Sequence, residues 1–463
     1  GAVVRKRPSP PAWLGIDVGT SSLKVIALGA DGVALQEQEL GLALTRPGPG
    51  RTEADPRDWT RAVDHLARPM TERYDVRAVG VTGQMHGTVL VDEHGVPMRP
   101  AVLWPDARAD AMRPRWDALS PSVLGRLGSP WAAGMTGPVL AWLAENEPEV
   151  VARAERVALP KDLVREHLVP GSTATDPSDA SGTLLWDVTG GAWSTDASAL
   201  VPARLLPTVR PSLEFVGTWQ DAEVVVGGGD TPVSLVTLEH AVDGWRAGDV
   251  VVNLGTGAQV IDPQTGPPTG TGWNGVHVYS GVRGDHYAMV AAQNAGLALS
   301  WAQRELDLTW DQLCALAQKT PPGAGGVLFA PFVSTERGAL GSSLPGAGWS
   351  TERGGALTPA QAARAALEAQ TFLVRRAWEL LDVEASRFLA VGGGARDPWV
   401  RQLLADVLGR PVLHVPMRSA AAAGAVLLAG GPSPKLEPLS ISEPAETPAL
   451  ENAYQRWRAA AYA

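Results

Sequence analysis

Cysteine is almost absent from this chain of 463 residues, which holds Cys314 and no other. A single cysteine forms neither an intramolecular disulfide nor a cysteine-based zinc site, and this usage fits a reducing cytoplasm. Cys314 sits in the apolar, helix-like stretch Leu-Cys-Ala-Leu, so we expect it to be a small buried core residue. The eight histidines show no zinc-ligand spacing, which argues against a catalytic zinc site.

Long hydrophobic runs and positive charge are also scarce. The longest uncharged apolar run, residues 420–431, is well short of the roughly 20 residues that span a bilayer. The net charge is −10, and only five residues are lysine. A net-acidic surface repels phosphate backbones and anionic lipid heads, so we expect neither nucleic acid nor membrane as a partner. Charged residues make up 19% and hydrophobic residues 45%, as in an ordinary folded protein, which excludes wholesale disorder.

Two glycine-tipped hairpins are the clearest local patterns. Residues 13–28 hold two apolar runs around a Gly-Thr-Ser-Ser tip, and a further strand follows over residues 33–40. A related pattern returns over residues 250–261 around Gly-Thr-Gly. Aligning the two tips places Asp17 opposite Asn253, which predicts that an α/β domain is duplicated.

Further strands and helices alternate in the second half. A long helix is predicted over residues 358–381, with Thr358 as its N-cap and proline at its first position. A strand over residues 388–391, a Gly-Gly-Gly turn, and a helix that ends at Gly409 then form an α/β unit. Residues 335–356 are rich in glycine and lack periodicity, so we expect a mobile surface loop or lid.

The domain division follows from the length and from the duplication. A chain of 463 residues predicts two to four domains. We expect the following segments: a disordered leader over residues 1–12, an N-terminal domain over 13–237, a C-terminal domain over 238–430, and a tail over 431–463.

The hairpin tips are candidates for phosphate binding. Gly19, Thr20 and Ser21 could present backbone N–H groups and hydroxyls to phosphate oxygens, as could Gly255 and Thr256. A hairpin tip needs glycine for its own turn, so each tip alone is a weak signal. Two facing tips could clamp a polyphosphate. Neither tip matches a P-loop, and no segment fits a dinucleotide-binding fingerprint, which disfavours a Rossmann dehydrogenase.

Two carboxylates follow predicted strands. Asp17 precedes the first tip, where it could bind Mg²⁺ through water. Asp230 follows an apolar strand and three glycines, where it could accept a proton from a substrate hydroxyl. A turn-stabilising aspartate explains the same local pattern equally well.

A third group of residues could bind a sugar. Met85 and His86 lie at the end of a predicted strand, where they could supply an apolar face and a polar nitrogen. A lone histidine is more often structural. Trp104 and Asp106 could add a stacking face and a hydroxyl acceptor.

In these segments the chain resembles the FGGY family of carbohydrate kinases. The resemblance extends in family order over about residues 13–430. It rests on the following stretches: GIDVGTSSLK at 15–24, TGQMHG at 82–87, RPAVLWPDAR at 99–108, LPKD at 159–162, TDPSDASGTLL at 175–185, GGGD at 227–230, NLGT at 253–256, GGGA at 392–395 and LLADVLGRP at 403–411.

The resemblance implies two actin-like, ribonuclease-H-like α/β domains with the active site in the cleft between them. It implies transfer of the γ-phosphoryl group of ATP, with Mg²⁺, to the terminal hydroxyl of D-xylulose. The carried-over roles are these: Asp230 as general base, Asp17 as the second carboxylate, both near the metal; Met85, His86, Trp104 and Asp106 at the sugar; Gly19, Thr20, Ser21, Gly255 and Thr256 at the phosphates; and Gly393, Gly394 and Ala395 at the adenosine.

Some positions depart from the family pattern. Pro105 and Thr231 stand where asparagine is common, Val139 stands where lysine is common, and the loop after Glu336 is altered. These departures leave other ketoses and polyols open as substrates, namely ribulose, glycerol and gluconate. They also leave open a catalytically weak sensor that binds sugar and nucleotide. The oligomeric state stays open as well, with a homodimer as the assembly considered.

Overall fold

The two predicted hairpins each form the centre of a mixed sheet. The computed structural model describes residues 8–344, 346–352 and 354–462. In the N-terminal half, β1 (Pro11–Val18), β2 (Ser22–Gly29) and β3 (Ala34–Gly41) run antiparallel in succession. The predicted leader lies outside the described residues over 1–7, and its last two residues already belong to β1.

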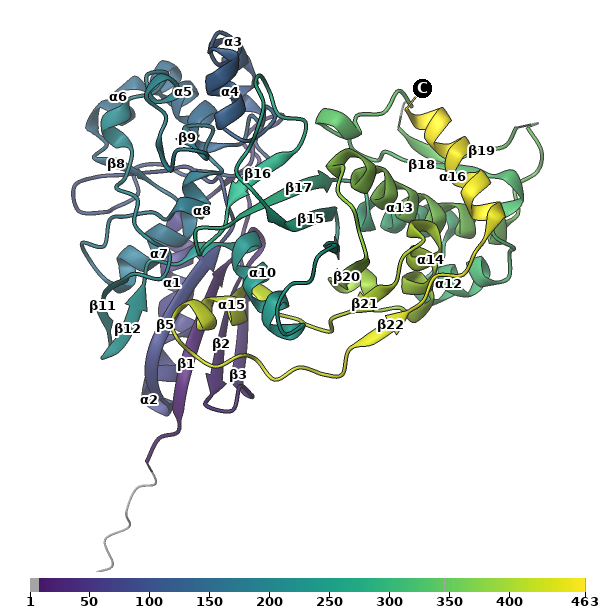
Figure 1. Cartoon of the computed structure of the whole chain (residues 1–463). Helices are drawn as coiled ribbons and strands as arrows, with labels where there is room; N and C mark the ends of the chain where they lie inside the picture. The colour runs from purple at the N-terminus through teal and green to yellow at the C-terminus, as the bar shows by residue number, and fades with distance from the viewer. Residues whose placement is uncertain (1–7, 345, 353, 463) are drawn as a thin grey trace, which may run out of the picture.

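The same topology appears twice. In the N-terminal sheet, β5 (Asp75–Gly83) and β12 (Ala222–Val225) continue the sheet parallel to β1, and the order is β3–β2–β1–β5–β12. The C-terminal sheet has the equivalent order β17–β15–β14–β20–β21 with the same directions. Its strands are β14 (Asp249–Leu254), β15 (Ala258–Thr265), β17 (His286–Ala292), β20 (Arg387–Val391) and β21 (Val412–His414). The predicted duplication and the two α/β domains are confirmed (Figure 1).

Edge strands and short strand pairs complete the β-structure. They are β4 (Glu53–Ala54), β6 (Val89–Val91), β7 (Ala101–Val102), β8 (Arg156–Ala158), β9 (Trp186–Asp187), β10 (Ala192–Trp193), β11 (Phe215–Trp219), β13 (Gly228–Gly229), β16 (His277–Ser280), β18 (Leu328–Pro331), β19 (Ala347–Ser350) and β22 (Ser440–Ser442). Strand β19 pairs with β18, so part of the predicted loop over 335–356 is a strand. That expectation was wrong there because the segment around β19 is rich in glycine and shows no strand-like alternation, and its pairing with β18 is what makes it a strand.

Most helices of the N-terminal half lie in the long segment between β5 and β12. The helices of this half are α1 (Pro56–Leu66), α2 (Arg68–Arg73), α3 (Arg113–Asp117), α4 (Pro121–Arg126), α5 (Thr136–Asn146), α6 (Pro148–Arg153), α7 (Pro160–Leu168), α8 (Pro177–Ala180) and α9 (Thr195–Ser198). None of the helices in the described part of the chain combines the length and apolar character that a membrane span requires.

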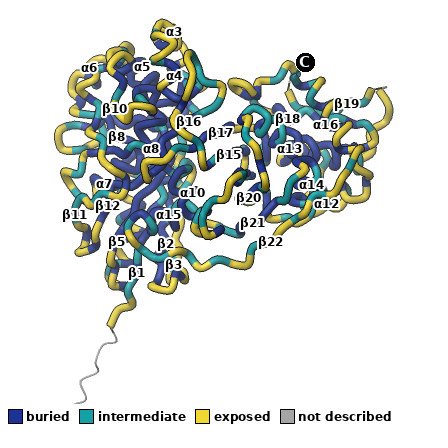
Figure 2. The backbone as a smooth tube through the Cα atoms, in the orientation of Figure 1, coloured by how far each residue is buried: buried dark blue, intermediate teal, exposed yellow. Residues whose placement is uncertain are grey.

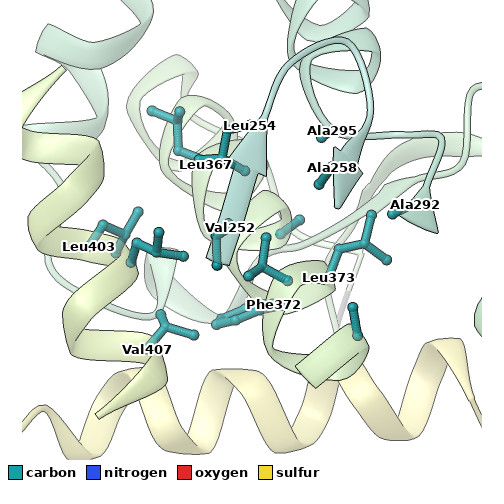
Figure 3. Close-up of a cluster of buried hydrophobic side chains, with 14 of the residues drawn as sticks. Val252, Leu254, Ala258, Ala292, Ala295, Leu367, Phe372, Leu373, Leu403 and Val407 are labelled. Atoms are coloured by element: carbon teal, nitrogen blue, oxygen red, sulfur yellow. The ribbon is translucent and has the colours of Figure 1, made fainter. Parts of the chain in front are cut away.

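The helices of the C-terminal half surround a hydrophobic core. They are α11 (Gly296–Leu306), α12 (Trp310–Gln318), α13 (Pro359–Leu381), α14 (Pro398–Leu408) and α16 (Pro448–Ala461). Thr358 caps α13 in a capping box with Gln361, as the sequence predicts. Figure 3 shows side chains of β14, α13 and α14 converging in this core, among them Val252, Phe372 and Leu403. Cys314 is buried there, as expected. Buried backbone runs through the centre of both halves (Figure 2).

The prediction of a tail over residues 431–463 is wrong for residues 448–461. Helix α16 covers residues 448–461, and its Tyr454 and Trp457 are buried in the C-terminal core. The indole Nε1–H of Trp457 donates to the carbonyl of Phe329 at 3.0 Å. A short, partly polar helix gives a weak local signal, and its burial depends on a surface formed by distant residues.

Two helices lie between the sheets, α10 (Asp230–Ala241) and α15 (Ala420–Leu428) (Figure 1). Although α15 belongs to the C-terminal half in sequence, it packs on the N-terminal sheet. A Cβ added at Gly80 on β5 would lie only 1.8 Å from the carbonyl oxygen of Ala425. This close approach requires glycine on the strand and small residues on the helix. The spatial boundary therefore does not coincide with the single break that we predicted between residues 237 and 238.

Candidate active site

Three strand ends meet at one edge of the N-terminal sheet, and the candidate carboxylates lie there. Strand β1 runs parallel to β5, with Asp17 paired to Thr82, and β13 pairs with the last two residues of β5. Asp17 is the penultimate residue of β1, while Asp230 follows β13 directly and begins α10. The carboxyl ends of parallel strands are the usual place for a ligand site in open α/β sheets.

Both carboxyl groups have raised pKa values. Burial, helped by the nearby negative charge of Asp230, raises the pKa of Asp17 to about 7, although the charge of Lys24 opposes the shift. Burial also raises the pKa of Asp230, to about 6, against hydrogen bonds from Thr231 that lower it. The backbone N–H of Thr231 donates to Asp230 Oδ1 at 2.8 Å. Perturbed carboxyl groups in one place are typical of a catalytic site.

The first hairpin tip lies beside these carboxylates. The amide of Gln84 donates to the carbonyl of Gly19 at 3.2 Å, and the hydroxyl of Thr20 donates to the amide oxygen of Gln84 at 3.4 Å. Ser21 is exposed at the tip. The predicted tip residues therefore lie together at the strand ends, held in place by the segment that follows β5.

Met85 and His86 lie just beyond β5. Nδ1 of His86 is 2.6 Å from the carbonyl oxygen of Gly182, so the proton must be on Nδ1 and Nε2 is left as an acceptor. Burial lowers the pKa of His86, which favours this neutral form. His86 has a φ of 77°, an uncommon conformation that its surroundings maintain. Met85 is 5% exposed, and Tyr287 directs its hydroxyl at the sulfur over 3.8 Å.

Trp104 and Asp106 lie close in sequence but differ in their environment. Trp104 is 46% exposed, and its indole N–H donates to the hydroxyl of Thr20 at 3.1 Å, so it borders the first hairpin tip. Asp106 is fully buried. Its Oδ2 accepts from the Thr52 backbone at 2.7 Å and from Arg108, and its Oδ1 accepts from Arg108 as well. The expectation that Asp106 accepts a sugar hydroxyl is wrong, because its carboxylate serves an internal ion pair with Arg108.

The predicted residues of the C-terminal half also gather at one strand end. Gly255 and Thr256 are exposed at the tip between β14 and β15, and their carbonyls accept from the first N–H groups of α11 at 3.0 and 2.9 Å. Gly393 and Gly394 form a short helical turn after β20, with Gly394 against Leu254 of β14. Ala395 is buried, and its carbonyl accepts from the guanidinium of Arg401 at 2.9 Å.

Lys24 is a site residue that the sequence reasoning missed. It pairs with Asp17 across the β1–β2 hairpin, and its Nζ is 3.4 Å from the carbonyl oxygen of Arg418. Its charge lowers the pKa of Asp17. The hairpin register, counted back from the tip, contains the signal that would have identified it.

Aromatic residues of the C-terminal half were missed as well. Tyr279 and Tyr287, on β16 and β17, pack behind the Met85–His86 segment of the N-terminal half, and the rings of His86 and Tyr279 have centroids 6.1 Å apart. His277 stacks on Tyr279 with centroids 5.2 Å apart. No local pattern links residues nearly 200 positions apart, so only the fold could identify this contact.

The donor set of the site fits a magnesium ion held mainly by a substrate. Asp17 Oδ1 is buried and lacks a hydrogen-bond partner among the described residues. Within the described ranges, no group of three or more metal-ligating side chains forms a complete protein cage. Mg²⁺ commonly binds through one or two carboxylates, several waters and substrate phosphates, which is the set that Asp17 and Asp230 could complete.

Three of the departures from the family pattern have defined surroundings. The N–H of Thr231 contacts the carboxylate of Asp230, as described above. Val139 is fully buried among hydrophobic side chains. Glu336 accepts from the backbone N–H groups of Gln293 and Asn294, so it anchors the altered loop to the C-terminal sheet.

The duplicated α/β topology, with two carboxylates of raised pKa at the strand ends of one copy, fits a phosphotransferase. The chain matches the N-terminal domain of the FGGY family of carbohydrate kinases over residues 12–242 and the C-terminal domain of that family over residues 250–431. The chain therefore belongs to the FGGY family of carbohydrate kinases, enzymes that transfer a phosphoryl group to an alcohol acceptor.

Curated relatives and solved structures agree with this assignment. The chain is 32% identical to the xylulose kinase of Streptomyces rubiginosus, covering 95% of this chain and 92% of that protein. It is 30% identical to the xylulose kinase of Escherichia coli K12, covering 86% and 85%. A crystal structure named as a xyloylose kinase from Brucella ovis superposes with a TM-score of 0.86 at 26% identity over 97% of this chain and 98% of that chain. The gluconate kinase of Lactobacillus acidophilus has a TM-score of 0.84 at 20% identity over 97% and 96%, which shows a common fold.

Proposed function

We propose that the protein is a kinase that transfers the γ-phosphoryl group of ATP to the terminal hydroxyl of D-xylulose. The products are D-xylulose 5-phosphate and ADP. The observation that carries this proposal is the position of Asp230, which begins α10 at the strand ends that also present Asp17, Met85 and the first hairpin tip. The choice of sugar is supported by relatives named as xylulose kinases that match most of the chain.

Asp230 acts as the general base in this proposal. With its pKa raised to about 6 by burial, its carboxylate is ionised at neutral pH and still basic enough to accept the proton of the sugar hydroxyl. The hydroxyl oxygen forms a bond to the γ-phosphorus while the bond from that phosphorus to the bridging oxygen breaks, and ADP leaves. The N–H of Thr231 orients one carboxylate oxygen, so the other can face the sugar.

Asp17 serves the phosphate side of the reaction. Its unpartnered Oδ1 and the Asp230 carboxylate would hold Mg²⁺ together with the phosphates, directly or through water. When bound, Mg²⁺ supplies positive charge that stabilises the transferring phosphoryl group. Lys24, which pairs with Asp17 across the hairpin, adds a protein cation at the same place.

The remaining residues divide between sugar and nucleotide. The N-terminal domain, residues 13–237, supplies Met85, His86 and Trp104 for the sugar; the neutral His86 offers Nε2 to a hydroxyl. The C-terminal domain, residues 238–430, supplies the adenosine site and shares the phosphate site with the first hairpin tip. The proposed nucleotide ligands are the N–H groups and hydroxyls of Gly19, Thr20, Ser21, Gly255 and Thr256 at the phosphates, and the backbone of Gly393, Gly394 and Ala395 at the adenosine. The cytoplasm, where ATP is abundant, is the proposed location.

The test is ADP release with Mg-ATP across D-xylulose, D-ribulose, L-ribulose, glycerol and D-gluconate, using wild type and Asp230→Ala. We expect D-xylulose to give the highest kcat/KM and the variant to lose about 10²- to 10⁴-fold in kcat, the range for removing a general base. Carbon-13 NMR of the product identifies the phosphorylated hydroxyl. Preference for another substrate would overturn the sugar assignment. Binding of sugar and ATP without ADP release would instead identify a sensor.

A further inference from the structure

A buried ionic cluster lies under the strand ends, on α7 and on the segment around α8. Lys161 is completely buried, and its Nζ lies 2.8 Å from Asp162, 2.8 Å from Asp176 and 2.7 Å from Asp179. Burial opposes the charge on Lys161, but the three carboxylates outweigh it and raise the pKa of Lys161. Arg165 completes the cluster with a 2.6 Å contact to Asp162.

Burying charged groups costs folding free energy unless each one is paired. Replacing a buried ionic cluster with apolar residues often stabilises a protein. Its presence therefore calls for a role other than stability. The mechanism proposed above gives none of these groups a role. What the cluster does provide is a rigid, fully oriented acceptor on Asp176.

Asp176 orients the hydroxyl of Ser178. Asp176 Oδ2 accepts from the Ser178 hydroxyl at 2.5 Å and from the Ser178 backbone N–H at 3.0 Å, while Asp176 Oδ1 accepts from Lys161. Because the Ser178 proton is committed to Asp176, its oxygen is left as an acceptor with a fixed direction. That oxygen accepts from the backbone N–H of Gly229 at 3.0 Å.

Gly229 is the residue immediately before Asp230. On its other side, Gly228 is held by the hydroxyl of Thr82, which donates to its carbonyl at 2.8 Å. Space around the segment is tight, since a Cβ at Gly229 would lie 2.7 Å from Met85 Cγ. The Ser178 hydrogen bond therefore acts on the short strand β13 at the point where the chain turns into α10 and presents the carboxylate of Asp230.

We propose that Ser178 is a positioning residue for phosphoryl transfer, which holds the Gly229 backbone, and through it the Asp230 carboxylate, in register with the sugar hydroxyl. Lys161 and Asp176 hold Ser178 in turn. This inference rests on the proposed function, because it assumes that Asp230 is the base. A displacement of about 1 Å at a reacting group can cost up to about 10²-fold in rate, so a single hydrogen bond at this position is sufficient to matter.

The chain offers a matched control in Ser212. Its hydroxyl donates to the same oxygen, Asp176 Oδ2, at 2.8 Å, and Ser212 is buried like Ser178. The Ser212 side chain has no hydrogen bond to β13 or α10 in the described part of the chain. Ser178→Ala and Ser212→Ala therefore remove the same group from the same carboxylate, and only Ser178→Ala frees the Gly229 N–H.

The experiment measures kcat, KM for ATP and sugar, and the thermal unfolding midpoint of both variants. We expect Ser178→Ala to lower kcat by about 10- to 100-fold with KM for ATP unchanged, and Ser212→Ala to keep kcat within about twofold at a similar unfolding midpoint. Equal kcat losses in the two variants, tracking their midpoints, would overturn the inference, since the cluster would then be structural only.

A second measurement places both substitutions in an Asp230→Asn background. If Ser178 acts through Asp230, adding Ser178→Ala to Asp230→Asn lowers the residual kcat no further. A further loss of the same size as in wild type would show that Ser178 acts independently of the base and would overturn the inference. Full activity of Asp230→Asn alone would instead overturn the proposed function, so the two failures are distinguishable.

Discussion

The two sheets share one topology but carry different chemistry at the equivalent hairpin. In the N-terminal sheet, Asp17 pairs with Lys24 across the strands, and the site is ionic. In the C-terminal sheet, Asn253 pairs with Gln259, and the amide of Asn253 donates to Gln259 Oε1 at 3.3 Å, so the site is neutral. The duplicated scaffold thus positions charge in one copy and hydrogen-bonding amides in the other. We infer that the chemistry of phosphoryl transfer belongs to the ionic copy and nucleotide binding to the neutral one.

Making the first hairpin neutral should have the largest effect. Asp17→Asn imitates the second hairpin, and we expect kcat to fall about 10²- to 10³-fold, the loss typical of removing one electrostatic contribution to a transition state. Initial rates across a magnesium titration check it, with Asn253→Ala as the control for loss of a hairpin polar group. A kcat for Asp17→Asn within a few-fold of wild type would contradict the division between ionic and neutral copies.

Disturbing the packing of α15 on the N-terminal sheet should have the next largest effect, which is on stability. Gly80→Ala places a Cβ where the carbonyl of Ala425 lies, so we expect the free energy of unfolding to fall by about 3 kcal/mol, at the upper end of overpacking costs. Gly41→Ala, at the end of β3 with open space around it, should change the free energy of unfolding by about 0.5 kcal/mol or less. Urea unfolding of both variants provides the comparison. Equal stability would mean that α15 is not seated on β5.

Adding charge to the neutral copy should have a smaller effect. Asn253→Asp places a carboxylate beside the loop that includes Gly392, and it would repel the anionic nucleotide. A like-charge contact of about 1 kcal/mol in water corresponds to about a fivefold rise in KM for ATP. KM for the sugar should stay constant and serves as the internal control. A rise in KM for the sugar alone would contradict the assignment of nucleotide binding to the C-terminal copy.

The last comparison concerns how stability depends on pH. Burial raises the pKa of Asp17 from 3.8 to about 7, so the folded state binds more protons than the unfolded state between these values. The free energy of unfolding therefore falls as the pH rises through this window. Asp17→Asn removes that loss, and we expect the variant to be more stable than wild type at pH 8 and similar to it near pH 4. Thermal unfolding at both values tests this, with the exposed Asp196→Asn as control. A gain of the same size at both pH values would contradict it.

Local patterns predicted the elements whose signals are short-range. The two hairpins were predicted from their glycine tips, and α13 from Thr358, Pro359 and the apolar repeat that follows. Helix α14 likewise begins after Asp397 and ends at Gly409, as predicted. In each case the residues that form a cap or a turn lie within a few positions of one another, so the sequence contains the whole interaction.

The sequence predictions were wrong or incomplete where the surroundings of a residue are formed by distant parts of the chain. The sequence around Asp106 gives no sign that the Thr52 backbone, 54 positions away, donates to its carboxylate. Helix α16 is stabilised mainly by the core that it covers. Tyr287 contacts Met85 only because β17 of the C-terminal half packs against the N-terminal half.

The sequence by itself determined the family, the two carboxylates and the glycine tips, because these are residue identities in a fixed order. Only the tertiary structure decided which polar groups are free to act. Asp17 and Asp106 are both aspartates that the resemblance places in the site, yet Asp17 retains an unpartnered oxygen at the strand ends and Asp106 is paired with Arg108 inside the protein. Burial and pairing are properties of the surroundings, and the surroundings of each group are brought together by segments far apart in the chain.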